Sequence, residues 1–103
     1  MTPADHRRHP RLDFEGRAWC EHRELTLYLP IANLSAGGLF IQTGAPLSAG
    51  ERLKVSFSGA DAGQEEMVAK VEIVWTGKTR RGAGVGCRFM SFLSGEAAYN
   101  QLI

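Results

Sequence analysis

Three arginines near the N-terminus are the first residues of this chain whose type and spacing suggest a chemical role. Arg7, Arg8 and Arg11 lie within one short polar stretch. A guanidinium group carries five donors in a planar fork, which matches phosphate oxygens and also the O6 and N7 edge of guanine. The stretch is therefore a candidate phosphate and guanine site, and a solvated basic tail is the alternative.

A second polar group follows an apolar run further along the chain. Asn33, Ser35, Gly37 and Gly38 belong to the stretch Asn-Leu-Ser-Ala-Gly-Gly. The amide of Asn33 can accept a hydrogen bond from guanine, and the hydroxyl of Ser35 can both donate and accept. Gly38 supplies either a positive φ or room for a close approach of the backbone. The stretch indicates a guanine-binding turn, and a β-turn with local side-chain caps is the alternative.

Alternation of apolar and polar residues predicts the elements that position these two groups. The strand pattern starts at Phe14, and Pro30 marks a strand edge or a bulge. The clearest extended runs are residues 25–31, 39–43, 53–57, 67–75 and 85–89. In the fourth run, Trp75 has the same parity as Val71 and Ile73, which favours a core position for its side chain.

The same reading predicts one long turn and one helix. Residues 77–84 are basic and rich in glycine, so we expect a hairpin loop there. Residues 94–103 predict a short C-terminal helix that Ser94 can cap. The residues expected to face the body of the protein from this helix are Ala98, Leu102 and Ile103.

The order of these elements predicts an all-β fold. About six short strands separated by turns fit a small closed antiparallel barrel, because closure leaves no exposed strand edge. Residues 1–13 are basic and contain two prolines, so we expect a flexible N-terminal arm there. A single barrel domain should then occupy residues 14–103.

Composition excludes several classes of function. The chain has 103 residues and a net charge of only +1, which argues against a general nucleic-acid binder. No apolar run reaches the roughly 20 residues that a membrane helix needs, so we expect a cytoplasmic protein that does not insert into membranes. Cys20 and Cys87 lack metal-site spacing and should be free thiols. The sequence shows no recognisable catalytic set, so we expect neither an enzyme nor a cofactor or metal protein.

The two polar motifs, taken together and in this order, resemble the PilZ domain family. The family's RxxxR motif matches Arg7 and Arg11, and its NxSxxG motif matches Asn33, Ser35 and Gly38. A Gly-Val-Gly-Cys-Arg-Phe stretch near the C-terminus adds to the resemblance, which covers essentially the whole chain.

The resemblance implies a six-stranded β-barrel that binds cyclic di-GMP, a bacterial second messenger. Arg7 and Arg11 would then hold phosphates and guanine edges from a mobile arm, and Arg8 would add charge or a stacking face. The residues expected to form the barrel side of the site are Asn33, Ser35, Gly37 and Gly38. Some family members place an aromatic residue late in the fifth strand against a guanine, which makes Trp75 a candidate contact as well as a candidate core residue.

A receptor of this kind should signal in trans, to an unidentified protein effector or through a homodimer, in motility, attachment or exopolysaccharide control. Two alternatives stay open. The first is a PilZ-like interaction module that binds no nucleotide. The second is a small barrel that binds single-stranded nucleic acid through the basic arm. The sequence also leaves open whether one or two cyclic di-GMP molecules would bind.

Overall fold

The computed structural model describes residues 12–58, 65–79 and 82–103. The elements in chain order are β1 (Leu12–His22), β2 (Leu25–Leu34), β3 (Gly38–Gln42), β4 (Arg52–Ser58), β5 (Glu66–Thr79), β6 (Gly82–Ser94) and α1 (Glu96–Leu102). Of the predicted N-terminal arm, residues 1–11 lie outside the described residues, and residues 12 and 13 begin β1.

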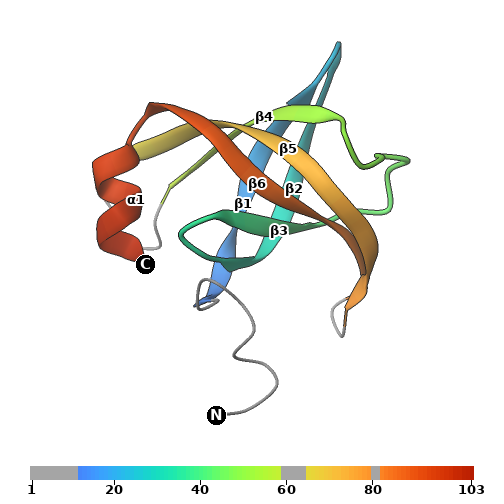
Figure 1. The fold of residues 1–103 in the computed structure, drawn as a ribbon, viewed down its shortest axis with the longest axis horizontal. Coiled ribbons are helices and arrows are strands. Elements are labelled where there is room, and N and C mark those ends of the chain that lie inside the picture. The colour runs from blue at the N-terminus through green and yellow to red at the C-terminus, as the bar shows by residue number, and fades with distance from the viewer. Residues whose placement is uncertain (1–11, 59–64, 80–81) are drawn as a thin grey trace.

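The six strands close into a barrel in the order β1-β2-β3-β6-β5-β4 (Figure 1). Every neighbouring pair is antiparallel, and β1 closes the barrel on β4 where Trp19 pairs with Ser56 and Cys20 with Val55. The predicted all-β, six-stranded antiparallel barrel with a short C-terminal helix is therefore confirmed. In the part of the chain that the structure describes, no helix is long and apolar enough to cross a membrane.

The interior of the barrel is apolar. Side chains that alternate along the strands point inward, as the period of two requires. Among the described residues no polar or charged side chain is buried there. The buried cluster consists of Phe14, Ala18, Cys20, Ile31, Leu34, Leu39, Ile41, Leu53, Val55, Phe57, Met67, Ala69, Val71, Ile73, Val85, Cys87 and Tyr99.

The first half of β2 pairs with β1 on one edge and with no described strand on the other, and this stretch of the two strands forms the β1–β2 ribbon (Figure 1). The pairing of β2 with β3 covers Ile31 to Leu34, so Pro30 lies just outside that ladder, at the predicted strand edge. A proline fits there because its nitrogen has no hydrogen to donate. On the ribbon Leu25 is 52% exposed, so the alternation that predicted the strand does not bury this leucine.

The predicted hairpin loop at residues 77–84 is wrong in extent. β5 and β6 continue to pair through Lys78 with Ala83 and Thr79 with Gly82, so most of the predicted loop is strand. Gly82 has a φ of 110°, a conformation that glycine adopts without steric cost and that allows the chain to reverse tightly.

The C-terminal helix begins differently from the prediction. Ser94 is the last residue of β6, and the N-cap is Gly95, with a φ of 79° and no side-chain cap. Ala98 and Leu102 pack against the core as expected. Ile103 is 41% exposed, and the fully buried residue of the helix is instead Tyr99.

Trp75 lies on the outer face of the barrel, contrary to the parity of the sequence. The register of β5 shifts between Ile73 and Trp75, because the strand contains an extra residue at Val74. Trp75 is therefore 37% exposed, while Ile73 stays in the core. Its indole stacks on Phe40, with ring centroids 5.2 Å apart, and covers Gly86.

We expect the two thiols to be inert in the folded protein. Both cysteines are free and buried, as predicted, and burial raises the pKa of each thiol to about 12. At pH 8 only about one thiol in 10⁴ would then be a thiolate, which is the reactive form. A chromogenic disulfide reagent should label both cysteines slowly in buffer and rapidly in urea. Rapid labelling of the folded protein would contradict the burial.

Replacing Gly86 by alanine should displace the indole of Trp75. A Cβ at this position would lie 2.2 Å from the indole nitrogen. We expect Gly86→Ala to lower the free energy of unfolding by about 1–3 kcal/mol, the usual cost of overpacking. In a Trp19→Phe background it should also shift the Trp75 emission.

The matched control for this substitution is Gly44→Ala, because a Cβ at Gly44 would meet nothing within 4 Å. Urea denaturation and fluorescence of both variants check the prediction. Equal stability and equal emission in the two variants would show that Trp75 is not packed on Gly86.

Candidate ligand-binding site

Four residues from four different strands form a row across the outer face of the barrel. Asn33 pairs with Phe40, Phe40 with Gly86, and Gly86 with Trp75. Directly paired residues in antiparallel strands place their side chains on the same face. This outer row (Asn33, Phe40, Gly86 and Trp75) crosses three strand spacings of about 4.8 Å each. The sequence-predicted residues Asn33 and Trp75 therefore share one surface, although they are far apart in the chain.

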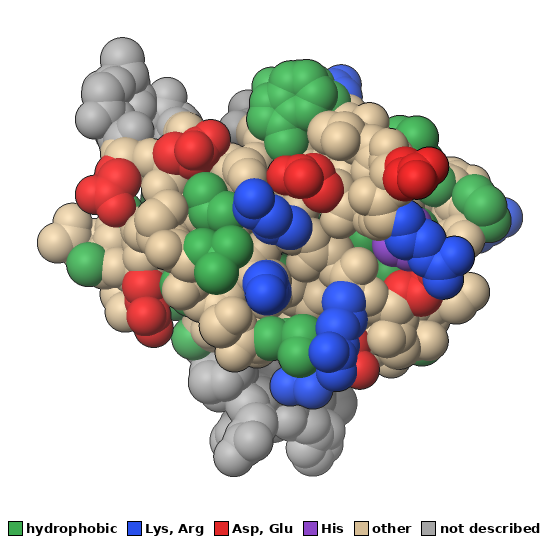
Figure 2. Space-filling view, turned by 90° about the horizontal axis from the view of Figure 1, so that it is seen from above, with side chains coloured by type: hydrophobic (Ala, Val, Ile, Leu, Met, Phe, Trp, Pro, Cys, Tyr) green, Lys and Arg blue, Asp and Glu red, His purple; other side chains and the backbone are tan. Residues whose placement is uncertain are grey.

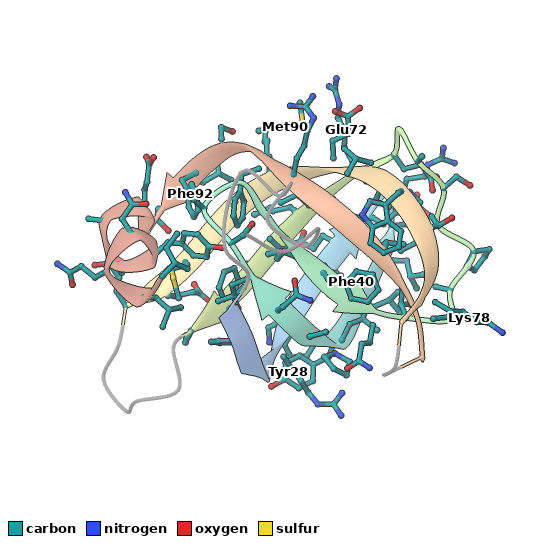
Figure 3. All side chains as sticks on the ribbon, turned by 60° about the horizontal axis from the view of Figure 1, so that its bottom comes forward. Tyr28, Phe40, Glu72, Lys78, Met90 and Phe92 are labelled. Atoms are coloured by element: carbon teal, nitrogen blue, oxygen red, sulfur yellow. The ribbon has the colours of Figure 1, made fainter. Side chains whose placement is uncertain are left out.

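The middle of the outer row is an aromatic surface formed by Phe40 and Trp75. Phe40 is 1% exposed although it points away from the barrel interior, because the indole of Trp75 covers it. Figure 3 shows Phe40 beside β3, well separated from Phe92 beside α1. Since Gly86 carries no side chain, the face of Trp75 can lie flat over β6. A partly exposed indole held in this way can stack on a planar base.

The turn from Ser35 to Gly38 lies next to the Asn33 end of the outer row. The N–H of Ser35 donates to the carbonyl of Gly38 at 2.9 Å. The Ser35 hydroxyl donates to the same carbonyl at 3.3 Å and accepts from the N–H of Gly38 at 3.2 Å. The turn thus has the local side-chain cap that the sequence left as an alternative. The hydroxyl oxygen retains a second lone pair with which it could accept from a ligand.

Gly38 is required for packing and not for an unusual backbone conformation. A Cβ at Gly38 would lie 1.9 Å from the carbonyl oxygen of Cys87 on β6, so every other residue would force the strands apart. Among the described glycines, positive φ occurs instead at Gly50, Gly82 and Gly95. Next to it, the carbonyl of Gly37 accepts from the N–H of Phe89 at 2.9 Å. The turn is therefore held closely against β6.

Tyr99 contacts this turn from the C-terminal helix, and sequence reasoning missed it. Its hydroxyl donates to the carbonyl of Ser35 at 2.5 Å and lies 3.4 Å from the carbonyl of Gly38. Burial raises the pKa of the Tyr99 hydroxyl, although the bond to Ser35 acts in the opposite direction, so the group stays protonated and remains a donor. The spacing of Tyr99 from Leu102 could have signalled a buried helix face.

Arg88 is a second residue that sequence reasoning missed. It pairs directly with Gly38, so its side chain lies on the same outer face, beside a position that has no side chain. The Arg88 side chain is 57% exposed, and its guanidinium forms an ion pair with Glu72, with Nη2 and Oε1 2.5 Å apart. Its parity with Gly86 in β6 is the signal that could have indicated this position.

The three predicted arginines, Arg7, Arg8 and Arg11, lie outside the described residues. The strand that follows them begins at Leu12, which pairs with Leu34 immediately before the turn.

A separate group of exposed aromatic residues lies on the β1–β2 ribbon. Trp19 and Tyr28 are each about half exposed and stack with ring centroids 4.5 Å apart. The guanidinium of Arg17 lies 5.7 Å from the Tyr28 ring centroid. Figure 2 shows the molecule from the top side of Figure 1, and this face carries acidic as well as basic side chains.

The comparison with known proteins identifies the family and the fold. The PilZ domain family matches residues 5–103. The inhibitor of motility MotI/DgrA from Bacillus subtilis has a similar structure, with a TM-score of 0.73 and 15% identity over 93% of this chain. This chain spans about half of the MotI chain, 51% of its length.

The PilZ domain of YcgR from Escherichia coli, whose structure was solved with cyclic di-GMP, is also similar. Its TM-score is 0.61, with 16% identity over 93% of this chain and 84% of that domain. No curated protein sequence matches the chain. Because the family match covers nearly every residue and the barrel has the corresponding fold, this chain belongs to the PilZ domain family.

Proposed function

We propose that this chain is a receptor that binds cyclic di-GMP on the outer row and the adjoining turn, with its N-terminal arginines completing the site. The observation that carries the proposal is the meeting of Asn33, the Ser35–Gly38 turn and Trp75 on one face, beside the start of β1. The similar fold of the YcgR domain solved with cyclic di-GMP supports the choice of ligand.

The chemistry of the face fits the two parts of this ligand. Each guanine presents a hydrogen-bonding edge, which suits the amide of Asn33, and a flat surface, which suits the indole of Trp75. The two phosphates need cations in a planar fork, and Arg7 and Arg11 supply them. Arg88 is a further cation on the same face, beside Gly38.

The role of the protein would be to present a different surface to a partner when the ligand is bound. Within the described residues, no group of three or more His, Cys, Asp or Glu side chains could hold a metal ion. PilZ domains are receptor or adaptor domains, and we propose that the bound ligand joins the arginine arm to the barrel as a composite surface. A protein effector that binds the free and the ligand-bound surfaces with different affinities would then respond to the ligand. Motility, attachment and exopolysaccharide production are the processes we propose.

Two other functions remain testable alternatives. The exposed pair of Trp19 and Tyr28, with Arg17 above one ring, could stack bases of a single-stranded nucleic acid. The net charge of only +1 differs from the strongly basic surface that is typical of such proteins. A PilZ-like module that acts through protein contacts alone is the other alternative.

We expect isothermal titration to show binding of cyclic di-GMP but not of GTP, with a stoichiometry of one or two. Arg11→Ala should weaken binding by about 10-fold or more, because a hydrogen bond to a charged group contributes about 1.5–3 kcal/mol. Lys70→Ala is the matched control, since it removes one exposed cation from β5.

Equal affinity of Arg11→Ala and wild type would exclude the proposed role of the arm. If the folded wild type binds no cyclic di-GMP at high micromolar concentration, the nucleotide-independent module becomes the better account. If an oligonucleotide displaces the nucleotide, the nucleic-acid alternative is favoured.

Trp75 should report the ligand directly. In a Trp19→Phe background the remaining tryptophan is Trp75, and we expect cyclic di-GMP to quench its emission by stacking on the exposed face. Trp75→Leu should weaken binding by about 1–3 kcal/mol, the usual contribution of a base stacked on an aromatic ring. Unchanged emission at saturating ligand would place the guanines elsewhere.

A further inference from the structure

The C-terminal helix touches the binding turn through one hydroxyl group. α1 lies at the same end of the barrel as the loop between β2 and β3 (Figure 1). The Tyr99 hydroxyl donates to the Ser35 carbonyl at 2.5 Å, and the Gly38 carbonyl lies 3.4 Å away. These two carbonyls belong to the first and last residues of the turn. One side chain therefore contacts both ends of the Ser35–Gly38 turn.

The aromatic ring of Tyr99 is fixed independently of that hydroxyl. It packs edge-on against Phe57 and Phe89, with centroids 6.0 and 4.9 Å away, and lies 5.3 Å from Phe92. The helix itself starts at Gly95, where a Cβ would lie 2.6 Å from the carbonyl oxygen of Glu66. The hydroxyl is thus presented to the turn by a rigid aromatic cluster that also belongs to the barrel core.

Among the hydrogen bonds of the described residues, those of Tyr99 are the ones that join the turn to α1. Its remaining hydrogen bonds run within the turn, between Ser35 and Gly38, or to β6, from Phe89 to Gly37. Without the tyrosine hydroxyl, the Ser35 carbonyl would lose its short bond in a partly buried place, and leaving such a group unsatisfied is costly. We expect the turn to sample other conformations in that case.

We propose that Tyr99 is a positioning residue for ligand binding, which couples the docking of α1 to occupation of the Ser35–Gly38 turn. The inference rests on the proposed function, because it assumes that cyclic di-GMP binds the Ser35–Gly38 turn in one particular conformation. Coupling between two sites is reciprocal: a helix that holds the turn favours the ligand, and a ligand that holds the turn favours the docked helix.

Tyr99→Phe tests the proposal, because it keeps the aromatic ring and removes only the hydroxyl. The control is Tyr28→Phe, since Tyr28 is the only other tyrosine and lies away from α1 (Figure 3). Three amides report on the turn without any ligand: those of Ser35 and Gly38, which bond within it, and that of Phe89, which bonds to Gly37.

We expect hydrogen exchange at these three amides to become about 3- to 10-fold faster in Tyr99→Phe, and cyclic di-GMP to bind about 3- to 10-fold more weakly, the range of one net hydrogen bond. Tyr28→Phe should change neither quantity. Wild-type exchange rates in Tyr99→Phe would overturn the positioning role, whatever the affinity.

A measurement on the unaltered protein tests the reciprocal effect. The Tyr99 amide bonds to the Gly95 carbonyl, and the Ile103 amide bonds to the Tyr99 carbonyl, so both report whether the helix is formed. An isolated helix of this length is not stable in water, so its formation depends on its packing against the barrel. Saturating cyclic di-GMP should slow their exchange in wild type and much less in Tyr99→Phe. If the ligand binds and leaves these rates unchanged, the coupling is refuted. If the wild type binds no ligand while the turn exchanges faster in Tyr99→Phe, the proposed function fails and the structural role of the hydroxyl stands.

Discussion

The contact between Gly38 and the Cys87 carbonyl is the constraint on which this end of the barrel depends. A single methyl group at position 38 would lie 1.9 Å from that oxygen, so β3 can approach β6 only with glycine there. This approach sets the register that pairs Gly38 with Arg88 and Phe40 with Gly86. The turn before β3 and the outer row after it are therefore placed by one close backbone contact.

The outer row shows how a barrel can carry a preorganised binding face outside its core. Phe40 points away from the interior and is nevertheless buried, because Trp75 lies over it and Gly86 leaves room for the indole. Apolar burial at the surface thus fixes the aromatic plane before any ligand arrives. A ligand that binds a rigid plane loses less conformational entropy in the protein, which favours affinity.

The sequence predicted most of the strands and the turn, because alternation and turn-forming glycines are local signals. Alternation favoured a core position for Trp75 and only the family resemblance indicated a surface contact, because one extra residue at Val74 reverses parity and no local pattern marks a bulge. Tyr99 was missed for a different reason. Its bond to Ser35 joins residues 64 apart in sequence, and only the folded chain brings them together. The arginine arm, predicted from composition, lies outside the described residues and stays a prediction.

The most direct test of the proposed binding face is a titration of the isotopically labelled protein with cyclic di-GMP, followed by amide and indole chemical shifts. The account predicts the largest shifts at residues 33–40 and 86–88 and at the indole N–H of Trp75, with little change at the β1–β2 turn, residues 23–24. Shifts concentrated on the β1–β2 ribbon, around Trp19 and Tyr28, would contradict it and would place the ligand on the second aromatic surface.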